Sequence, residues 1–129
     1  MFRRRIIEQL RNWLKKVDRK PLLLSGARQI GKTWVLKEFG RTNFENVAYF
    51  SFDKDSAVCQ LFQTTKDPFR LIQQLSFIVG SEIKPQKTLL IFDEIQECPE
   101  ALQSLKYFCE EAPQFAVVCA GSLLGVYPI

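Results

Sequence analysis

The sequence contains no histidine and only four cysteines among its 129 residues. Without imidazole groups, the chain cannot form a histidine-ligated zinc site or a catalytic pair of the Ser-His or Cys-His type. The cysteines stand at positions 59, 98, 109 and 119, and no two of them have a Cys-x-x-Cys spacing. We therefore expect them to be small apolar core residues of a reduced, cytoplasmic protein.

Long apolar runs are also missing. No run approaches the roughly 20 residues that a membrane-spanning helix requires, and no uninterrupted apolar stretch follows the basic N-terminus as in a secretory signal. We therefore expect no membrane partner. Hydrophobic residues make up 47% and charged residues 25% of the chain. This is the balance of a soluble globular protein, and the length suits one domain.

Positive charge is concentrated at the start of the chain. Residues 1–20 contain eight Lys or Arg and two acids, whereas residues 21–129 contain ten Lys or Arg and twelve acids. Between positions 4 and 17 the apolar residues recur at steps of three and four, which predicts an amphipathic helix. They are Ile6, Ile7, Leu10, Trp13, Leu14 and Val17. We divide the chain into this basic helical segment, 1–20, and a core, 21–129. The basic segment would suit nucleic acid as a partner, but a solvated charged face is the simpler interpretation.

From residue 21 onward, short apolar runs alternate with helical segments. The runs predicted to be strands cover residues 21–25, 46–52, 88–92 and 115–120. The predicted helices cover residues 32–39, 55–64, 67–79 and 99–111, and we expect Gly40 to end the first of them and Gly80 the third. The alternation predicts an α/β fold in three layers, with a parallel sheet and helices on both of its faces.

A glycine-containing loop lies between the first predicted strand and the first core helix. The pattern Gly-x-x-x-x-Gly-Lys-Thr is that of a P-loop, whose inward-pointing backbone N–H groups bind phosphate oxygens at the positive end of the following helix. Lys32 would reach the β- and γ-phosphates, and the Thr33 hydroxyl would ligate Mg²⁺. We add Trp34, although packing is its simpler role. The predicted nucleotide-binding residues are Gly26, Ala27, Arg28, Gln29, Ile30, Gly31, Lys32, Thr33 and Trp34.

Two acids follow the third predicted strand. Asp93 is expected to hold Mg²⁺ as a Walker-B aspartate, and Glu94 is expected to act as the general base that activates water. A strand and two helical segments separate this strand from the P-loop, so the Walker-B strand need not adjoin the P-loop strand. A glutamate beside the aspartate goes with ATPases of this additional-strand arrangement. The acids are followed by Ile95 and Gln96 and the chain has no Asn-Lys-x-Asp, so ATP is favoured over GTP. For Gln96, a place in a turn is preferred over a role in orienting water.

The fourth predicted strand ends in Gly-Ser. In a parallel sheet the carboxyl ends of all strands reach the same edge, where ligands bind. Ser122 is therefore expected near Glu94, at the position of a sensor residue that contacts the γ-phosphate or the water. The alternative is a turn of small residues that leaves the strand.

These sites together resemble the prokaryotic ATPases of the AAA+ superfamily whose P-loop reads Gly-Ala-Arg-Gln-x-Gly-Lys-Thr. Such proteins carry Asp-Glu-Ile-Gln after the Walker-B strand and Gly-Ser at the sensor strand. The corresponding stretches here are GARQIGKT at 26–33, DEIQ at 93–96 and AGS at 120–122. The resemblance implies binding of ATP, ADP and Mg²⁺, and ATPase activity directed to an uncharacterised partner.

The sequence departs from this family at its end. It stops at Ile129, so a fifth core strand, a helical lid and an arginine finger are expected to be missing. The P-loop strand would then be an apolar edge that favours self-association. The first function hypothesis is an ATPase domain. The second is a nucleotide-binding module without significant turnover, and the third is a P-loop kinase of a small metabolite.

Overall fold

A parallel sheet of four strands forms the centre of the computed structural model, which describes residues 2–25 and 32–121. The strands are β1 (Leu22–Ser25), β2 (Asn46–Ser51), β3 (Thr88–Asp93) and β4 (Ala116–Gly121). Their order across the sheet is β1-β4-β3-β2, and every adjacent pair is parallel. The predicted α/β class is confirmed. The strand that carries Asp93 is separated from β1 by β4, as the additional-strand arrangement requires.

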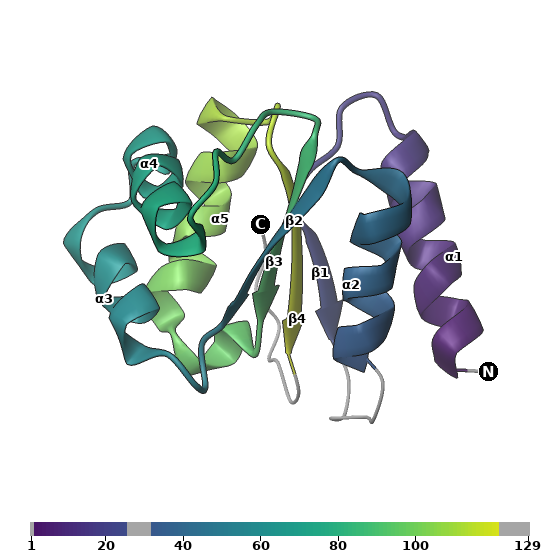
Figure 1. Ribbon diagram of the computed structural model, residues 1–129, viewed down its shortest axis with the longest axis horizontal. Helices are drawn as coiled ribbons and strands as arrows, with labels where there is room; N and C mark the ends of the chain where they lie inside the picture. Colours follow the sequence, from purple (N-terminus) through teal and green to yellow (C-terminus); the bar gives the residue numbers. More distant parts are fainter. Residues whose placement is uncertain (1, 26–31, 122–129) are drawn as a thin grey trace.

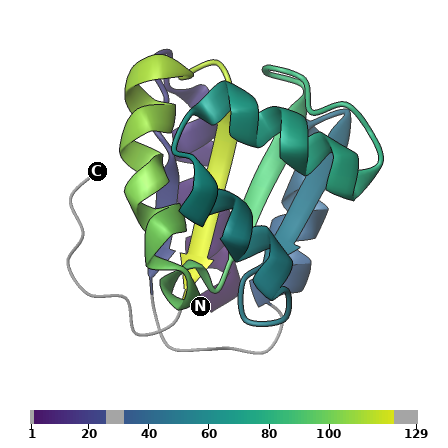
Figure 2. The same ribbon diagram turned by 90° about the vertical axis from the view of Figure 1, so that its left-hand side faces the viewer.

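Helices cover both faces of the sheet (Figure 1). The first face carries α1 (Phe2–Lys15) and α2 (Lys32–Asn43). The second carries α3 (Ser56–Thr64), α4 (Pro68–Val79) and α5 (Pro99–Glu111), with the short 3-10 helix η1 (Ile95–Glu97) leading into α5 (Figure 2). We call these the α1–α2 face and the α3–α5 face.

Strict alternation along the strands explains how both faces are filled. All six residues of β3 are buried. Leu89 and Ile91 join the cluster under α1 and α2, whereas Leu90 and Phe92 join the larger cluster under α3, α4 and α5. Successive side chains of a strand point to opposite faces, so a strand covered on both sides must be apolar at every position. The continuous apolar runs of the sequence follow from this requirement.

The first helix packs through Ile6, Leu10 and Trp13, which are all buried. The Trp13 indole N–H donates a hydrogen bond to the Lys20 carbonyl at 2.6 Å, which fixes the segment that leads into β1. The helix ends at Lys15, two residues earlier than predicted, and Val17 is fully exposed rather than part of the apolar face. The charged residues Arg4, Arg5, Arg11 and Lys15 of this helix are exposed, which both the solvated face and a charged partner would require.

Gly40 does not end α2, because this helix continues to Asn43. A methyl group at Gly40 would lie 2.5 Å from Val47 Cγ2 and 3.0 Å from Leu89 Cδ2. The glycine is needed where the helix approaches the sheet closely, and not for a left-handed turn. The prediction for Gly80 is confirmed, since it follows α4 in the left-handed conformation with φ 84°. Asp67 and Pro68 begin that helix as a capping residue and an N-terminal proline.

The cysteines correct a further prediction. Cys59 and Cys98 form a disulfide across 39 residues of sequence, so they are not two reduced core residues. Cys109 and Cys119 are free thiols, of which Cys119 is fully buried in β4. Burial raises the pKa of the Cys119 thiol far above its usual value. The spacing rule failed because the two partners come from elements that only the tertiary fold brings together.

The edge of the sheet at β1 has the exposure that was expected of it. Within residues 2–25 and 32–121, β1 pairs with β4 alone. Leu22 and Leu23 are partly exposed, whereas Leu24 is buried against the α1–α2 cluster. Among the same residues, no helix is long and apolar enough to cross a membrane.

Candidate functional site

Three segments that are distant in sequence meet at the carboxyl end of the sheet, which is the lower edge in Figure 1. They are the first turn of α2, the end of β3, and β2. Residues 89, 91 and 93 of β3 alternate onto the α1–α2 face, so Asp93 shares this face with α2 and with Tyr49 of β2. The geometry of the site follows from this placement.

The Asp93 carboxylate is the centre of the site. It is buried, with 4% of its surface exposed. The Thr33 hydroxyl donates a hydrogen bond to Asp93 Oδ2 at 2.8 Å, and the Tyr49 hydroxyl donates to the same oxygen at 2.7 Å. The backbone N–H of Glu94 donates to Asp93 Oδ1 at 3.0 Å. Three donors therefore fix the position of the carboxylate. The Thr33 hydroxyl lies beside it, so one metal ion could contact both side chains.

Tyr49 is a residue of the site that the sequence did not reveal. Its ring is half-buried on β2, and Lys37 Nζ lies 4.1 Å from the ring centre. Burial and the hydrogen bond to Asp93 raise the pKa of Tyr49 to about 12. The phenol therefore keeps its proton at any physiological pH and donates a hydrogen bond to Asp93. The sequence placed Tyr49 in a predicted strand, and the alternation of side chains along a strand assigns it to one face of the sheet. That pattern does not say which residue of the neighbouring strand it contacts.

Lys32 is the first residue of α2 and is 6% exposed. In the part of the chain that the structure describes, its Nζ atom is buried and has no hydrogen-bond partner. A buried ammonium group without a partner is costly. It lies at the positive end of a helix of 12 residues, where an anion is favoured. The residues present therefore fit a phosphate group.

Glu94 is buried and adopts the left-handed conformation with φ 51° and ψ 48°. Non-glycine residues are rare in this region, and they concentrate at functional sites. The Gln96 side-chain N–H donates a hydrogen bond to Glu94 Oε1 at 2.8 Å, while Gln96 Oε1 is buried without a partner among the described residues. Gln96 is in the turn that was expected, but it also orients the carboxylate of Glu94.

Several predicted site residues cannot be placed. Gly26, Ala27, Arg28, Gln29, Ile30 and Gly31 of the predicted P-loop lie outside the described residues, as does Ser122. Trp34 is described, and it is 57% exposed rather than packed in the core. Together with Ile7, Arg11 and Glu38 it lines a pocket of about 260 Å³ between α1 and α2.

Comparison with known proteins adds to this geometry. The family described as AAA domain matches residues 18–127, which is most of the chain. The chain belongs to this family. Membership of the AAA domain family places the protein among nucleotide-binding domains of the ATPase type. The match begins after α1, so the basic helix precedes the part that defines the AAA domain. Comparison with curated proteins found no match.

Proposed function

We propose that this AAA domain binds ATP with Mg²⁺, hydrolyses it to ADP and phosphate, and transmits the resulting change to a partner. Two observations carry the proposal: the buried Lys32 ammonium group has no hydrogen-bond partner among the described residues, and the next residue, Thr33, is hydrogen-bonded to Asp93. A phosphate anion would be a partner for the Lys32 ammonium group. The oxygens of Thr33 and Asp93 would suit a hard cation such as Mg²⁺.

The chain's own residues divide the work of binding. Lys32 contacts the phosphate end of the nucleotide, and residues 26–31, which lie outside the described part of the chain, are proposed as the rest of the phosphate-binding loop. Thr33 and Asp93 hold the metal, and Tyr49 keeps the aspartate in place through its 2.7 Å hydrogen bond. Mg²⁺, when bound, supplies positive charge that offsets the negative charge of the phosphates.

Glu94 is proposed as the general base. Its carboxylate would accept a proton from a water molecule, and the Gln96 N–H at 2.8 Å sets its direction. Gln96 Oε1 is buried and has no hydrogen-bond partner among the described residues. Ser122 is proposed as a sensor of the γ-phosphate at the end of β4.

We further propose a cytoplasmic location and self-association along β1. The charged α1 helix is left as a second route to a partner, nucleic acid included.

Calorimetric titration with Mg-ATP tests the binding step. The wild-type chain is expected to bind and Lys32→Ala to lose binding, whereas Lys106→Ala is the matched control because Lys106 is exposed on α5 at the opposite face. Wild-type affinity in Lys32→Ala would overturn the assignment of the site.

Turnover separates the ATPase from a module that only binds nucleotide. Glu94→Gln is expected to retain Mg-ATP binding and to lose phosphate release. If the wild-type chain binds Mg-ATP but releases no phosphate, the binding-module alternative is correct. Transfer of phosphate to a small metabolite rather than to water would favour the kinase alternative.

A further inference from the structure

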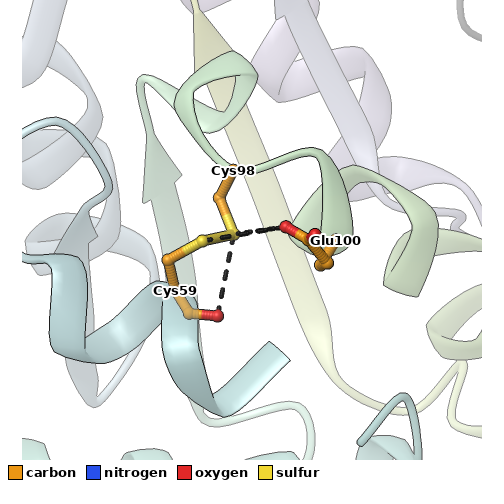
Figure 3. Close-up of side chains that lie close together, drawn as sticks. All are labelled: Cys59, Cys98 and Glu100. Atoms are coloured by element: carbon orange, nitrogen blue, oxygen red, sulfur yellow. Dashed lines mark hydrogen bonds between the residues drawn. A yellow bond between two sulfur atoms is a disulfide. The ribbon is translucent and has the colours of Figure 1, made fainter. Parts of the chain in front are cut away.

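A disulfide joins Cys59 to Cys98 (Figure 3), and Cys98 stands four residues after the proposed general base, Glu94. Cys59 comes from α3, and Cys98 stands between η1 and α5, with the two Cα atoms 5.8 Å apart. Cys59 is partly exposed, whereas Cys98 is fully buried. Cys59 is therefore the more exposed partner of the pair, and the one that a reagent from solvent would reach first.

Oxygen atoms near both sulfurs could accept hydrogen bonds from the thiols of the reduced pair. Cys98 Sγ lies 3.7 Å from Glu100 Oε1 and 3.8 Å from the Cys59 carbonyl oxygen, and Cys59 Sγ lies 3.9 Å from the same Glu100 oxygen. The sulfurs of a disulfide carry no protons, so neither sulfur donates to these oxygens while the bond is closed. After reduction, each new S–H group has an acceptor already within reach.

We propose that Cys59 and Cys98 form a reversible thiol–disulfide site that exchanges with small-molecule thiols and controls the segment bearing Glu94. The reversible exchange stands on the cysteine geometry alone, whereas the effect on Glu94 rests on the proposed function. A disulfide in a reducing compartment is usually a redox-sensing or catalytic one, so the proposed cytoplasmic location agrees with a bond that opens and closes.

The reduction balances as ordinary thiol–disulfide exchange. The thiolate of a small-molecule thiol attacks Sγ of the more exposed Cys59, and the S–S electron pair passes to Cys98 Sγ. Cys98 is the N-cap residue of α5, where the positive helix end stabilises the departing thiolate until it takes a proton from water. A second small-molecule thiol releases Cys59 from the mixed disulfide. The products are two protein thiols and one small-molecule disulfide.

A short run of backbone hydrogen bonds connects the disulfide to the general base. The Glu97 N–H donates to the Glu94 carbonyl at 3.1 Å, and the Cys98 N–H donates to the Ile95 carbonyl at 3.0 Å. Glu94 and Cys98 are thus the two ends of one 3-10 turn. Closing the disulfide ties the far end of this turn to α3, and opening it leaves the turn held by these hydrogen bonds and its packing.

The exchange itself is tested without nucleotide. The native chain is equilibrated in buffers with increasing ratios of reduced to oxidised glutathione, and free thiols are counted by alkylation and mass spectrometry. We expect two thiols to appear together on the peptides of Cys59 and Cys98 and to disappear again on reoxidation. Cys109→Ser, the matched control, should keep this transition. A pair that stays closed in excess reduced glutathione, or that stays open in oxidised glutathione, would overturn the proposal.

Glu100→Gln tests the acceptor without disturbing either cysteine. The neutral amide accepts a hydrogen bond more weakly than the carboxylate, which favours the closed form when both thiols are protonated. Loss of the negative charge would instead stabilise a thiolate, so the titration is made well below the usual thiol pKa of about 8.5. We expect the reduced-to-oxidised ratio at the midpoint to rise by about threefold, the effect of a weakened hydrogen bond. An unchanged midpoint would show that Glu100 has no part in the site.

The effect on Glu94 is measured by hydrogen exchange of the 94–98 amides and by phosphate release, both with the disulfide closed and with it open. We expect exchange to be about fivefold faster with the disulfide open, the lower end of ordinary coupling between sites, and Cys109→Ser to show the same change. Equal exchange in the two states would overturn the control of this segment. Changed exchange in a chain that does not hydrolyse ATP would support the redox control while contradicting the proposed ATPase function.

Discussion

The two faces of the sheet are filled by different kinds of side chain and carry different features. On the α3–α5 face, Phe92 packs with four other rings at centre distances of 5.6 to 6.3 Å: Phe50, Phe52, Phe62 and Phe108. On the α1–α2 face, α2 approaches the sheet so closely that Gly40 has no room for a methyl group. The aromatic rings of the α3–α5 face pack against one side of β3. On the α1–α2 face, the close approach of α2 places Thr33 next to Asp93.

The largest effect is expected at the centre of the α3–α5 face. Phe92→Ala leaves a cavity among four rings and should lower the free energy of unfolding by about 3–5 kcal/mol, as measured by urea denaturation. Phe77→Ala is the matched control, because Phe77 is 81% exposed and should change stability by less than about 0.5 kcal/mol. Equal effects of the two variants would contradict the central place of Phe92.

On the α1–α2 face the close approach of α2 can be tested in the opposite direction. Gly40→Ala forces a methyl group against the stiff Val47 side chain, and overpacking of about 1–3 kcal/mol should exceed the roughly 1 kcal/mol gain in helix propensity. Thermal unfolding of the double variant with Val47→Ala gives the coupling. Val47→Ala should restore part of the stability lost in Gly40→Ala but none of that lost in Gly80→Ala. A methyl group at Gly80 has open space, and an alanine there is disfavoured only by the φ of 84°.

Much of this architecture could be predicted from the sequence, because burial on both faces leaves a continuous apolar run. The four strands and the place of Asp93 at the end of the third follow from that pattern. Gly40 was assigned wrongly, since a glycine that ends a helix and one that lets it pack closely look alike in a sequence. Tyr49 and the Cys59–Cys98 pair depend on strand register and helix packing, which connect residues about 40 positions apart.

A smaller effect is expected where the α1–α2 face reaches the site. Tyr49→Phe removes one of three donors to Asp93, so the Mg²⁺ concentration at half-saturation of ATP binding should rise by about threefold to tenfold. Nucleotide binding in the presence of a chelator should stay unchanged. An equal loss with and without Mg²⁺ would indicate a general structural role for this tyrosine.

The smallest effect concerns alkaline pH. Because the pKa of Tyr49 is raised to about 12 in the folded chain from about 10 in an unfolded one, the unfolded chain releases its proton first. Stability contributed by the neutral phenol is therefore complete below pH 10 and is lost as the pH rises toward 12. Unfolding midpoints should fall less steeply over this interval in Tyr49→Phe than in the wild-type chain.

The Lys32 ammonium group, which is buried without a hydrogen-bond partner among the described residues, makes the stability of the folded chain depend on the concentration of its ligand. A ligand that binds only the folded form adds stability with its concentration, by about 2.7 kcal/mol at one hundred times its dissociation constant. Chains without nucleotide would unfold more often and would be degraded first by proteases that act on open states. If the proposed function holds, nucleotide depletion would lower the abundance of this protein.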